Sequence, residues 1–200
     1  MGLIYRIIRK LFFIVSTHLC HLRTKCTMSW LGVKHSSFKT TGIPHFTICR
    51  GGQMTIGDAF TMHNTIQGNP IGCYERCTFF IGNGAHLSIG SHVGISQTAL
   101  IAITNITIKD NVKIGGGTCI YTSDFHSLDP IIRRGTDDIL NRNNAPVVIE
   151  EDVFIGARCI ILKGVTIGRN SIIGAGSVVT HSIPPNQIWG GNPAVFIRNL

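Results

Sequence analysis

The chain has 200 residues, of which only 14% are charged, and it contains 23 glycines among many Ile and Val. This length suits one domain with its own core, and the composition favours β structure with tight turns over helices linked by ion pairs. The net charge is +8, but no aromatic–basic signature of a base-stacking module accompanies it, so we expect no nucleic-acid partner.

The positive charge is concentrated at the start of the chain. Residues 1–57 carry eight Lys and Arg side chains and no acid, and from Asp58 onward ten basic and ten acidic side chains balance. A solvated basic flank accounts for this asymmetry, and attraction to an anionic membrane surface is the alternative.

Residues 1–40 are predicted to form a basic amphipathic helical segment. The apolar residues that follow helical spacing are Leu3, Ile4, Ile7, Ile8, Leu11, Phe12 and Val15. This apolar stretch is too short to span a bilayer and lacks the small-x-small cleavage site of a signal peptide. We expect the helix to pack on its own domain or on a neighbouring subunit of a cytoplasmic protein, with peripheral membrane contact as the alternative.

A six-residue period marks residues 41–190 and is clearest near the C-terminus. Six aliphatic residues are each six apart, namely Ile149, Ile155, Ile161, Ile167, Ile173 and Val179. Two positions before each lies a small or branched residue, and strand side chains two apart point to the same face. Period six does not fit a helix of 3.6 residues per turn. The pattern predicts a solenoid of stacked strands, three hexads to a triangular coil, with the aliphatic side chains along its axis.

This hexad run resembles the hexapeptide-repeat family, and the resemblance covers roughly residues 45 to 195. It implies an all-β fold, a left-handed parallel β-helix. The handedness is taken from the family, because ordinary parallel crossovers are right-handed. The N-terminal segment and the C-terminal tail, residues 191–200, are expected to cover the open ends of the solenoid.

The seven cysteines include no CxxC pair and leave one over. We therefore expect reduced, mostly buried thiols and no metal site. No His-x4-His pair is present either, so the zinc site of the γ-class carbonic anhydrases, which share this prism, is not supported.

The repeat is interrupted by an excursion over residues 121–146, which is predicted to project as a loop. A long excursion costs ordering entropy without extending the core, which is typical of functional loops. It is rich in charged residues and carries one histidine, His126, in the run SDFHSLDP. Histidine is the side chain best suited to accept a proton near neutral pH, so His126 is the candidate catalytic residue.

The run SDFHSLDP, the following APVVIEEDVFIGARCIILKGVTIG and the tail GGNPAVFIRNL resemble the sugar O-acetyltransferases of the maltose/galactoside type. The resemblance implies that His126 is the base that takes a proton from an acceptor hydroxyl as it attacks the thioester of acetyl-CoA, without an acyl-enzyme. Asp124 is expected to orient the imidazole or contact the acceptor, or to cap its own turn.

The resemblance also implies a homotrimer with its cofactor groove between adjacent prisms. Gly156 and Ala157 match the backbone that holds the pantetheine arm, and Arg198 matches an arginine that meets a CoA phosphate. Phe154 stands where many relatives carry Trp, so the wall of the acetyl or acceptor pocket is kept and the indole donor is lost. Asn105 is expected to reach the acceptor or to serve as a turn residue.

Three functions stay open at this point. The leading hypothesis is an acetyl-CoA-dependent O-acetyltransferase of a carbohydrate hydroxyl, in a polysaccharide unit or its precursor, with no metal required. The second keeps acetyl-CoA but moves the acceptor to the amine of an amino-sugar or another small molecule. The third, a non-catalytic solenoid that binds or supports a partner, predicts neither the histidine-bearing excursion nor the GNPA tail.

Overall fold

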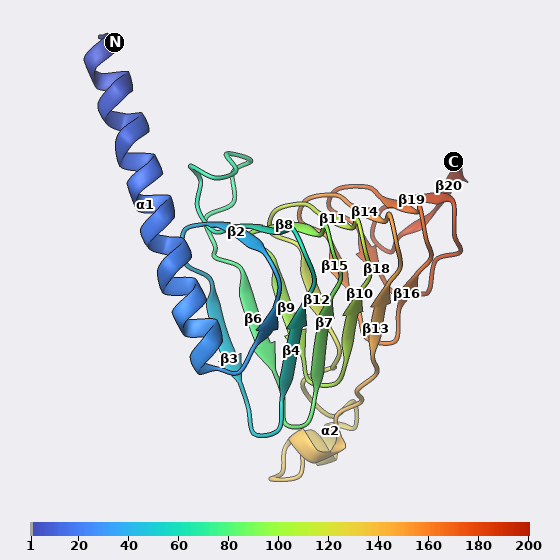
Figure 1. Ribbon diagram of the computed structural model, residues 1–200. Coiled ribbons are helices and arrows are strands. Elements are labelled where there is room, and N and C mark those ends of the chain that lie inside the picture. The colour runs from blue at the N-terminus through green and yellow to red at the C-terminus, as the bar shows by residue number, and fades with distance from the viewer. Residues whose placement is uncertain (1) are drawn as a thin grey trace.

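A computed structural model describes residues 2–200 of the protein. A long N-terminal helix, α1 (Leu3–Trp30), precedes a solenoid of short strands (Figure 1). The strands belong to three sheets, which we number in the order in which the chain first enters them.

Up to residue 179, successive strands of the chain go to successive sheets. The first sheet contains β1 (Lys34–His35), β4 (Gln53–Ile56), β7 (His86–Ile89), β10 (Ile106–Ile108), β13 (Val147–Ile149) and β16 (Thr166–Ile167). The second contains β2 (Phe38–Thr41), β5 (Phe60–His63), β8 (Gly94–Ser96), β11 (Lys113–Ile114), β14 (Phe154–Ile155), β17 (Ile172–Ile173), β19 (Gln187–Gly190) and β20 (Val195–Asn199). The third contains β3 (His45–Ile48), β6 (Thr78–Ile81), β9 (Ala99–Ala102), β12 (Cys119–Tyr121), β15 (Ile160–Ile161) and β18 (Val178–Val179). Apart from β19 with β20, neighbouring strands are parallel, so the fold is a three-sided parallel β-helix.

The axis of the solenoid is filled by the aliphatic side chains of the hexads. In the second sheet Ile155 lies between Ile114 and Ile173, its partners in the neighbouring strands, and all three are buried. The smaller hexad residues point inward as well, as Cys159 does. Full burial of one such aliphatic side chain stabilises the fold by about 1.5–3 kcal/mol. The stacked hexads therefore hold the coils in register.

The coils stack so closely at some corners that a side chain does not fit. A Cβ added to Gly156 would lie 2.5 Å from the backbone N of Ala175 in the next coil. Gly174 takes the same place one coil later, where the nearest atom to an added Cβ would be the backbone O of Trp189, at 3.6 Å. Coil stacking therefore requires glycine at residue 156 and tolerates a methyl group at residue 174.

The two ends of the solenoid are covered by different elements. The last turns of α1 pack on β2, where Met28 and Thr24 are fully buried and the His21 ring stacks on Phe38 with centroids 4.4 Å apart. The first half of α1 extends away from the solenoid (Figure 1). At the other end, β20 folds back antiparallel on β19.

The solenoid begins and ends elsewhere than the hexad pattern indicates. It begins at Lys34, so the expected boundary between residues 40 and 41 falls within β2. Because β2 turns Phe38 and Thr40 inward, one of its inward positions is polar and the hexad is hard to recognise there. Residues 191–200 form no separate tail, since β20 lies within them and pairs with β19.

Two loops leave the repeat at different edges of the prism. Residues 64–77 join the second sheet to the third, and the hexad pattern did not reveal this loop; the backbone O of Gly72 accepts a hydrogen bond from Nη2 of Arg158 at 3.1 Å. Residues 122–146 join the third sheet to the first and contain α2 (Pro130–Arg133) and the 3-10 helix η1 (Ile139–Asn141). This second edge lies opposite the second sheet: Figure 1 shows α2 below the prism and β8, β11 and β14 along its top.

Candidate active site

The loop of residues 122–146 is closed at its base by backbone hydrogen bonds. The Asp124 N–H donates to the Asn143 carbonyl at 3.0 Å, and the Ala145 N–H donates to the Thr122 carbonyl at 3.1 Å. These bonds bring the two ends of the excursion together, so the loop projects from one corner without disturbing the coils above and below it.

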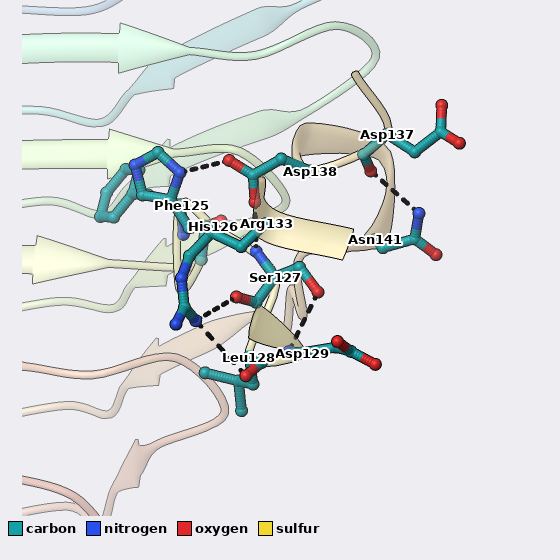
Figure 2. Close-up of polar contacts among 10 residues, drawn as sticks. Phe125, His126, Ser127, Leu128, Asp129, Arg133, Asp137, Asp138 and Asn141 are labelled. Atoms are coloured by element: carbon teal, nitrogen blue, oxygen red, sulfur yellow. Dashed lines mark hydrogen bonds and ion pairs between the residues drawn. The ribbon is translucent and has the colours of Figure 1, made fainter. Parts of the chain in front are cut away.

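The loop presents His126 beside a carboxylate, as Figure 2 shows. The His126 Nδ1 lies 2.6 Å from Oδ2 of Asp138, and Oδ1 of Asp138 accepts a hydrogen bond from the Ser127 backbone N–H at 2.7 Å. The His126 side chain is 62% exposed, whereas that of Asp138 is 14% exposed. The ring is therefore fixed at one nitrogen and open to solvent at the rest of its edge.

The Asp138 carboxylate is held in its charged form. The hydrogen bond from His126 and then that from the Ser127 N–H lower the pKa of Asp138 below its usual range. An ionised carboxylate accepts a hydrogen bond from the Nδ1–H group of a neutral imidazole, which leaves the lone pair at Nε2. Asp138 thus selects the tautomer in which Nε2 of His126 is the proton acceptor.

The short helix α2 holds the backbone on either side of Ser127. Asp129 caps it, since its Oδ1 accepts hydrogen bonds from the N–H groups of Ile131 at 2.7 Å and Ile132 at 3.3 Å. From the last turn of α2, Nη1 of Arg133 donates to the carbonyl of Ser127 at 2.8 Å (Figure 2). The segment that carries His126 is thereby tied to α2.

The residue before His126 takes a left-handed backbone conformation. Phe125 has a φ of +65°, and its N–H donates to Oγ of Ser123 at 2.9 Å. Its ring meets that of Tyr121 edge-on, with centroids 5.4 Å apart. Burial raises the pKa of Tyr121 to about 12, so its phenol stays protonated near neutral pH. Non-glycine residues adopt this conformation rarely, and here it is accompanied by the hydrogen bond to Ser123 and the aromatic contact.

Asp124 does not contact the imidazole, which is contacted by Asp138 instead, and a contact of Asp124 with the acceptor stays a prediction. The Asp124 Oδ1 is 2.8 Å from Nζ of Lys163, and its Oδ2 accepts a hydrogen bond from Nδ2 of Asn143 at 3.3 Å. Asp124 therefore ties the base of the loop to the following coil. The sequence offered several acids in the loop, and Asp138 was not singled out because an irregular loop has no period from which a contact twelve residues away can be read.

Asn105 lies at the same edge of the prism as the loop and is used within the coils. Its Oδ1 accepts a hydrogen bond from the His86 N–H at 2.9 Å, and its carbonyl accepts one from the Val147 N–H at 3.0 Å. These bonds link three successive coils just where the loop returns to the first sheet. Asn105 thus lies in the turn between coils, and a contact of its side chain with the acceptor stays a prediction.

The residues expected to line the acetyl or acceptor pocket and to hold the cofactor lie away from the loop that carries His126. Phe154 is half exposed on the outer face of the second sheet, where it lines a groove of about 390 Å³ together with Ser96 and Lys113. Gly156 is buried at the next corner, with its N–H bonded to the Ile173 carbonyl at 2.8 Å. The half-buried Ala157 follows it.

Arg198 is exposed on β20, and Nη1 donates to the carbonyl of Asn199 at 3.2 Å. It lies on the second sheet, as Phe154 does. Because that sheet is opposite the edge that carries the loop, one chain presents His126 and the groove on opposite sides of its prism (Figure 1).

Within residues 2–200, no three His, Cys, Asp or Glu side chains are placed to hold a metal ion. All seven cysteines are unpaired. Cys159 is buried inside the solenoid, and burial raises the pKa of its thiol.

Comparisons with known proteins agree with this architecture, a solenoid of hexads with a loop that carries a histidine. A family model described as the hexapeptide repeat of succinyl-transferase matches residues 146–181. A hexapeptide-repeat acetyltransferase from Vibrio cholerae, solved with acetyl coenzyme A, is 30% identical, with a TM-score of 0.56; the match covers 84% of this chain and 72% of that one. The chain therefore belongs to the hexapeptide-repeat acetyltransferase family.

Two curated relatives extend the comparison. The galactoside O-acetyltransferase of Lactococcus lactis is 38% identical over 132 residues, which are 64% of this chain and 60% of the relative. The 2,3,4,5-tetrahydropyridine-2,6-dicarboxylate N-acetyltransferase of Clostridium perfringens is 43% identical over 58 residues, which are 29% of this chain and 25% of the relative. The chain spans 44% to 60% of the length of the first curated relatives that it matches.

Proposed function

We propose that the protein is an acetyl-CoA-dependent O-acetyltransferase that acts on a carbohydrate hydroxyl, in a polysaccharide unit or its precursor. The observation that carries the proposal is the His126–Asp138 pair, with its 2.6 Å contact, on a loop that interrupts an otherwise regular solenoid. The similarity to the galactoside O-acetyltransferase supports the choice of a sugar hydroxyl as acceptor.

His126 acts as the general base in this proposal. Its Nε2 takes the proton of the acceptor hydroxyl while the acceptor oxygen attacks the thioester carbonyl, and Asp138 stabilises the imidazolium that results. The C–S bond then breaks, the proton returns from His126 to the leaving sulfur, and coenzyme A departs as the thiol. The acetyl group passes directly to the acceptor oxygen, and no residue of the chain is acylated.

We infer further that the site is completed between subunits of a homotrimer of left-handed prisms. His126 and the groove at Phe154 lie on opposite sides of one prism, so a single chain does not bring them together. The tip of the loop also exposes large apolar side chains, with Leu128, Ile131 and Leu140 at 67%, 78% and 82% exposure. Such a cluster fits a contact with a neighbouring copy.

The remaining roles follow from that arrangement. The loop of one copy would bring His126 to the second sheet of the next, where Phe154 forms a wall of the acetyl pocket. The backbone at Gly156 and Ala157 would then lie along the pantetheine arm. Arg198 is exposed and free to contact a phosphate of CoA. We place this enzyme in the cytoplasm, where acetyl-CoA is made available to it.

Transfer to an amine is the second candidate, and the matched N-acetyltransferase favours keeping it. The imidazole of His126 would remove a proton from an attacking amine as readily as from a hydroxyl, so the acceptor distinguishes the two.

The test is thiol release from acetyl-CoA with a panel of sugars, oligosaccharides and amino-sugars, followed by mass spectrometry of the product. The proposal predicts acceptor-dependent release and an acetyl ester on a sugar oxygen. An acetamide as the sole product would establish the N-acetyltransferase instead. Tight binding of acetyl-CoA without release for any acceptor class would contradict both enzymes and favour a binding protein.

A further inference from the structure

The first half of α1 is an apolar helix without a partner in residues 2–200. Ile4 and Phe12 are 74% and 75% exposed, whereas Met28, near the end of the same helix, is fully buried. The exposed large apolar side chains of this half are Leu3, Ile4, Tyr5, Ile7, Ile8, Leu11, Phe12, Phe13, Ile14 and Val15. In Figure 1 this half of the helix projects beyond the solenoid.

Most of these apolar side chains face away from the rest of the molecule, although Phe12 and Phe13 line the groove between α1 and the loop of residues 64–77. With 3.6 residues per turn, Ile8, Leu11 and Val15 share one side of the helix. Thr24 and Met28, which face the solenoid, share the largely opposite side, and both are fully buried. Folding of the chain therefore leaves a broad apolar face directed outward.

The opposite side of the same half is basic. Arg6, Arg9 and Lys10 line a groove between α1 and the loop of residues 64–77. The whole of α1 contains no acid, and the first acid of the chain is Asp58. These cations therefore have no carboxylate partner on their own helix, and the helix combines an outward apolar face with an uncompensated positive one.

We propose that the first half of α1 docks in the plane of an anionic membrane surface. The apolar face enters the boundary between headgroups and acyl chains, and Arg6, Arg9 and Lys10 lie at the level of the lipid phosphates. Within residues 2–200, no helix is long and apolar enough to cross a membrane.

A membrane fits these observations better than a second copy of the helix. A helix–helix seam needs a narrow apolar stripe bordered by charges that pair across it. Here the apolar face extends round the helix from Ile7 to Phe12, and the flanking charges are all positive. Two copies would repel each other, whereas anionic lipid neutralises both.

The test is sedimentation of the full chain with vesicles of phosphatidylcholine alone or with one quarter phosphatidylglycerol. The docking face is tested with Arg6→Gln, Arg9→Gln and Lys10→Gln in one chain, and with Ile8→Gln and Leu11→Gln in another. Glutamine keeps helix propensity, which circular dichroism checks. The matched control removes three exposed arginines of the solenoid surface and its first loop, with Arg50→Gln, Arg76→Gln and Arg169→Gln.

We expect binding to the anionic vesicles that weakens as salt shortens the range of the attraction. Removal of the three helix cations lowers the partition coefficient roughly 100-fold, because each cation near the surface contributes about a fivefold effect. The apolar variant loses binding, and the control retains it. The assay needs neither acetyl-CoA nor acceptor, so a failure of the proposed enzymatic activity does not affect it.

Three results would overturn the proposal. The wild type would stay in the supernatant with anionic vesicles, or it would bind both vesicle types equally and be insensitive to loss of the helix cations. In the third, the apolar substitutions would change the sedimentation coefficient of the protein without any vesicle binding. That outcome would assign the face to contact between copies of the chain.

Discussion

Asp138 engages His126 and the backbone of Ser127 with one carboxylate oxygen each, at 2.6 Å and 2.7 Å. The same group therefore sets the direction of the ring and fixes the backbone from which the ring projects. A base held in this way is oriented before any acceptor binds, which lowers the cost of reaching the reactive geometry.

The substitution Asp138→Asn tests this orientation. The amide keeps the size of the side chain but removes its charge, so the preferred tautomer and the stabilised imidazolium are both lost. We expect kcat to fall roughly 10²- to 10⁴-fold with little change in KM for acetyl-CoA. Asp137→Asn is the matched control, because the Asp137 side chain is exposed and only its carbonyl is used, by Asn141. Equal loss in both variants would contradict the role of Asp138.

Arg133 is expected to order the loop without taking part in the chemistry. In Arg133→Gln the hydrogen bonds to the carbonyls of Ser127 and Leu128 are lost. We expect about fivefold faster amide exchange in residues 125–133, which corresponds to about 1 kcal/mol. Arg134→Gln removes an adjacent exposed cation and serves as the control. Unchanged exchange in both would show that α2 does not depend on this contact.

Coil stacking at Gly156 is expected to be a sensitive point of the C-terminal coils. A methyl group there meets the Ala175 backbone, so Gly156→Ala lowers the free energy of unfolding by about 1–3 kcal/mol. Gly174→Ala, where an added Cβ has its nearest neighbour at 3.6 Å, changes it by less than about 0.5 kcal/mol. Urea unfolding of the two variants checks the difference, and equal stabilities would contradict the stacking explanation.

His63 makes the stability of the first coils depend on pH. Burial lowers the pKa of His63, so the unfolded chain binds a proton over a range in which the folded chain does not. The contribution of neutral His63 is therefore complete above about pH 6.5 and falls as the pH drops below it. We expect Tm to decrease from pH 7 to pH 5, and less steeply in His63→Asn. His21, whose pKa burial also lowers, keeps part of the slope. An unchanged slope would show that His63 does not contribute.

The solenoid could be predicted from the sequence because its period is repeated in side chains that point inward. Ile155, Ile161 and Ile167 have no other explanation at their spacing, and all are buried. The loop of residues 64–77 was not predicted, because the inward positions of the strands before it are not all aliphatic. Thr40, for example, is a polar residue at an inward position. A helical segment was expected over residues 1–40, and the helix ends at Trp30 because the first strand of the solenoid begins at Lys34.

Only part of the candidate site could be predicted from the sequence. His126 is the one histidine in the segment that interrupts the hexad repeat, so it could be recognised from the sequence alone. Asp124 was the nearer acid in sequence, but Lys163 from the next coil holds it. Asp138 reaches the ring only because α2 and η1 fold the loop back on itself, a path that no sequence period encodes.

We propose above that His126 is the general base of an acetyl transfer. The most direct measurement is kcat/KM for thiol release in His126→Ala, with the best acceptor of the panel and with the oligomeric state and acetyl-CoA affinity measured on the same sample. If His126 is the general base, kcat/KM decreases roughly 10²- to 10⁴-fold with assembly and affinity unchanged. Wild-type kcat/KM in the variant would contradict it.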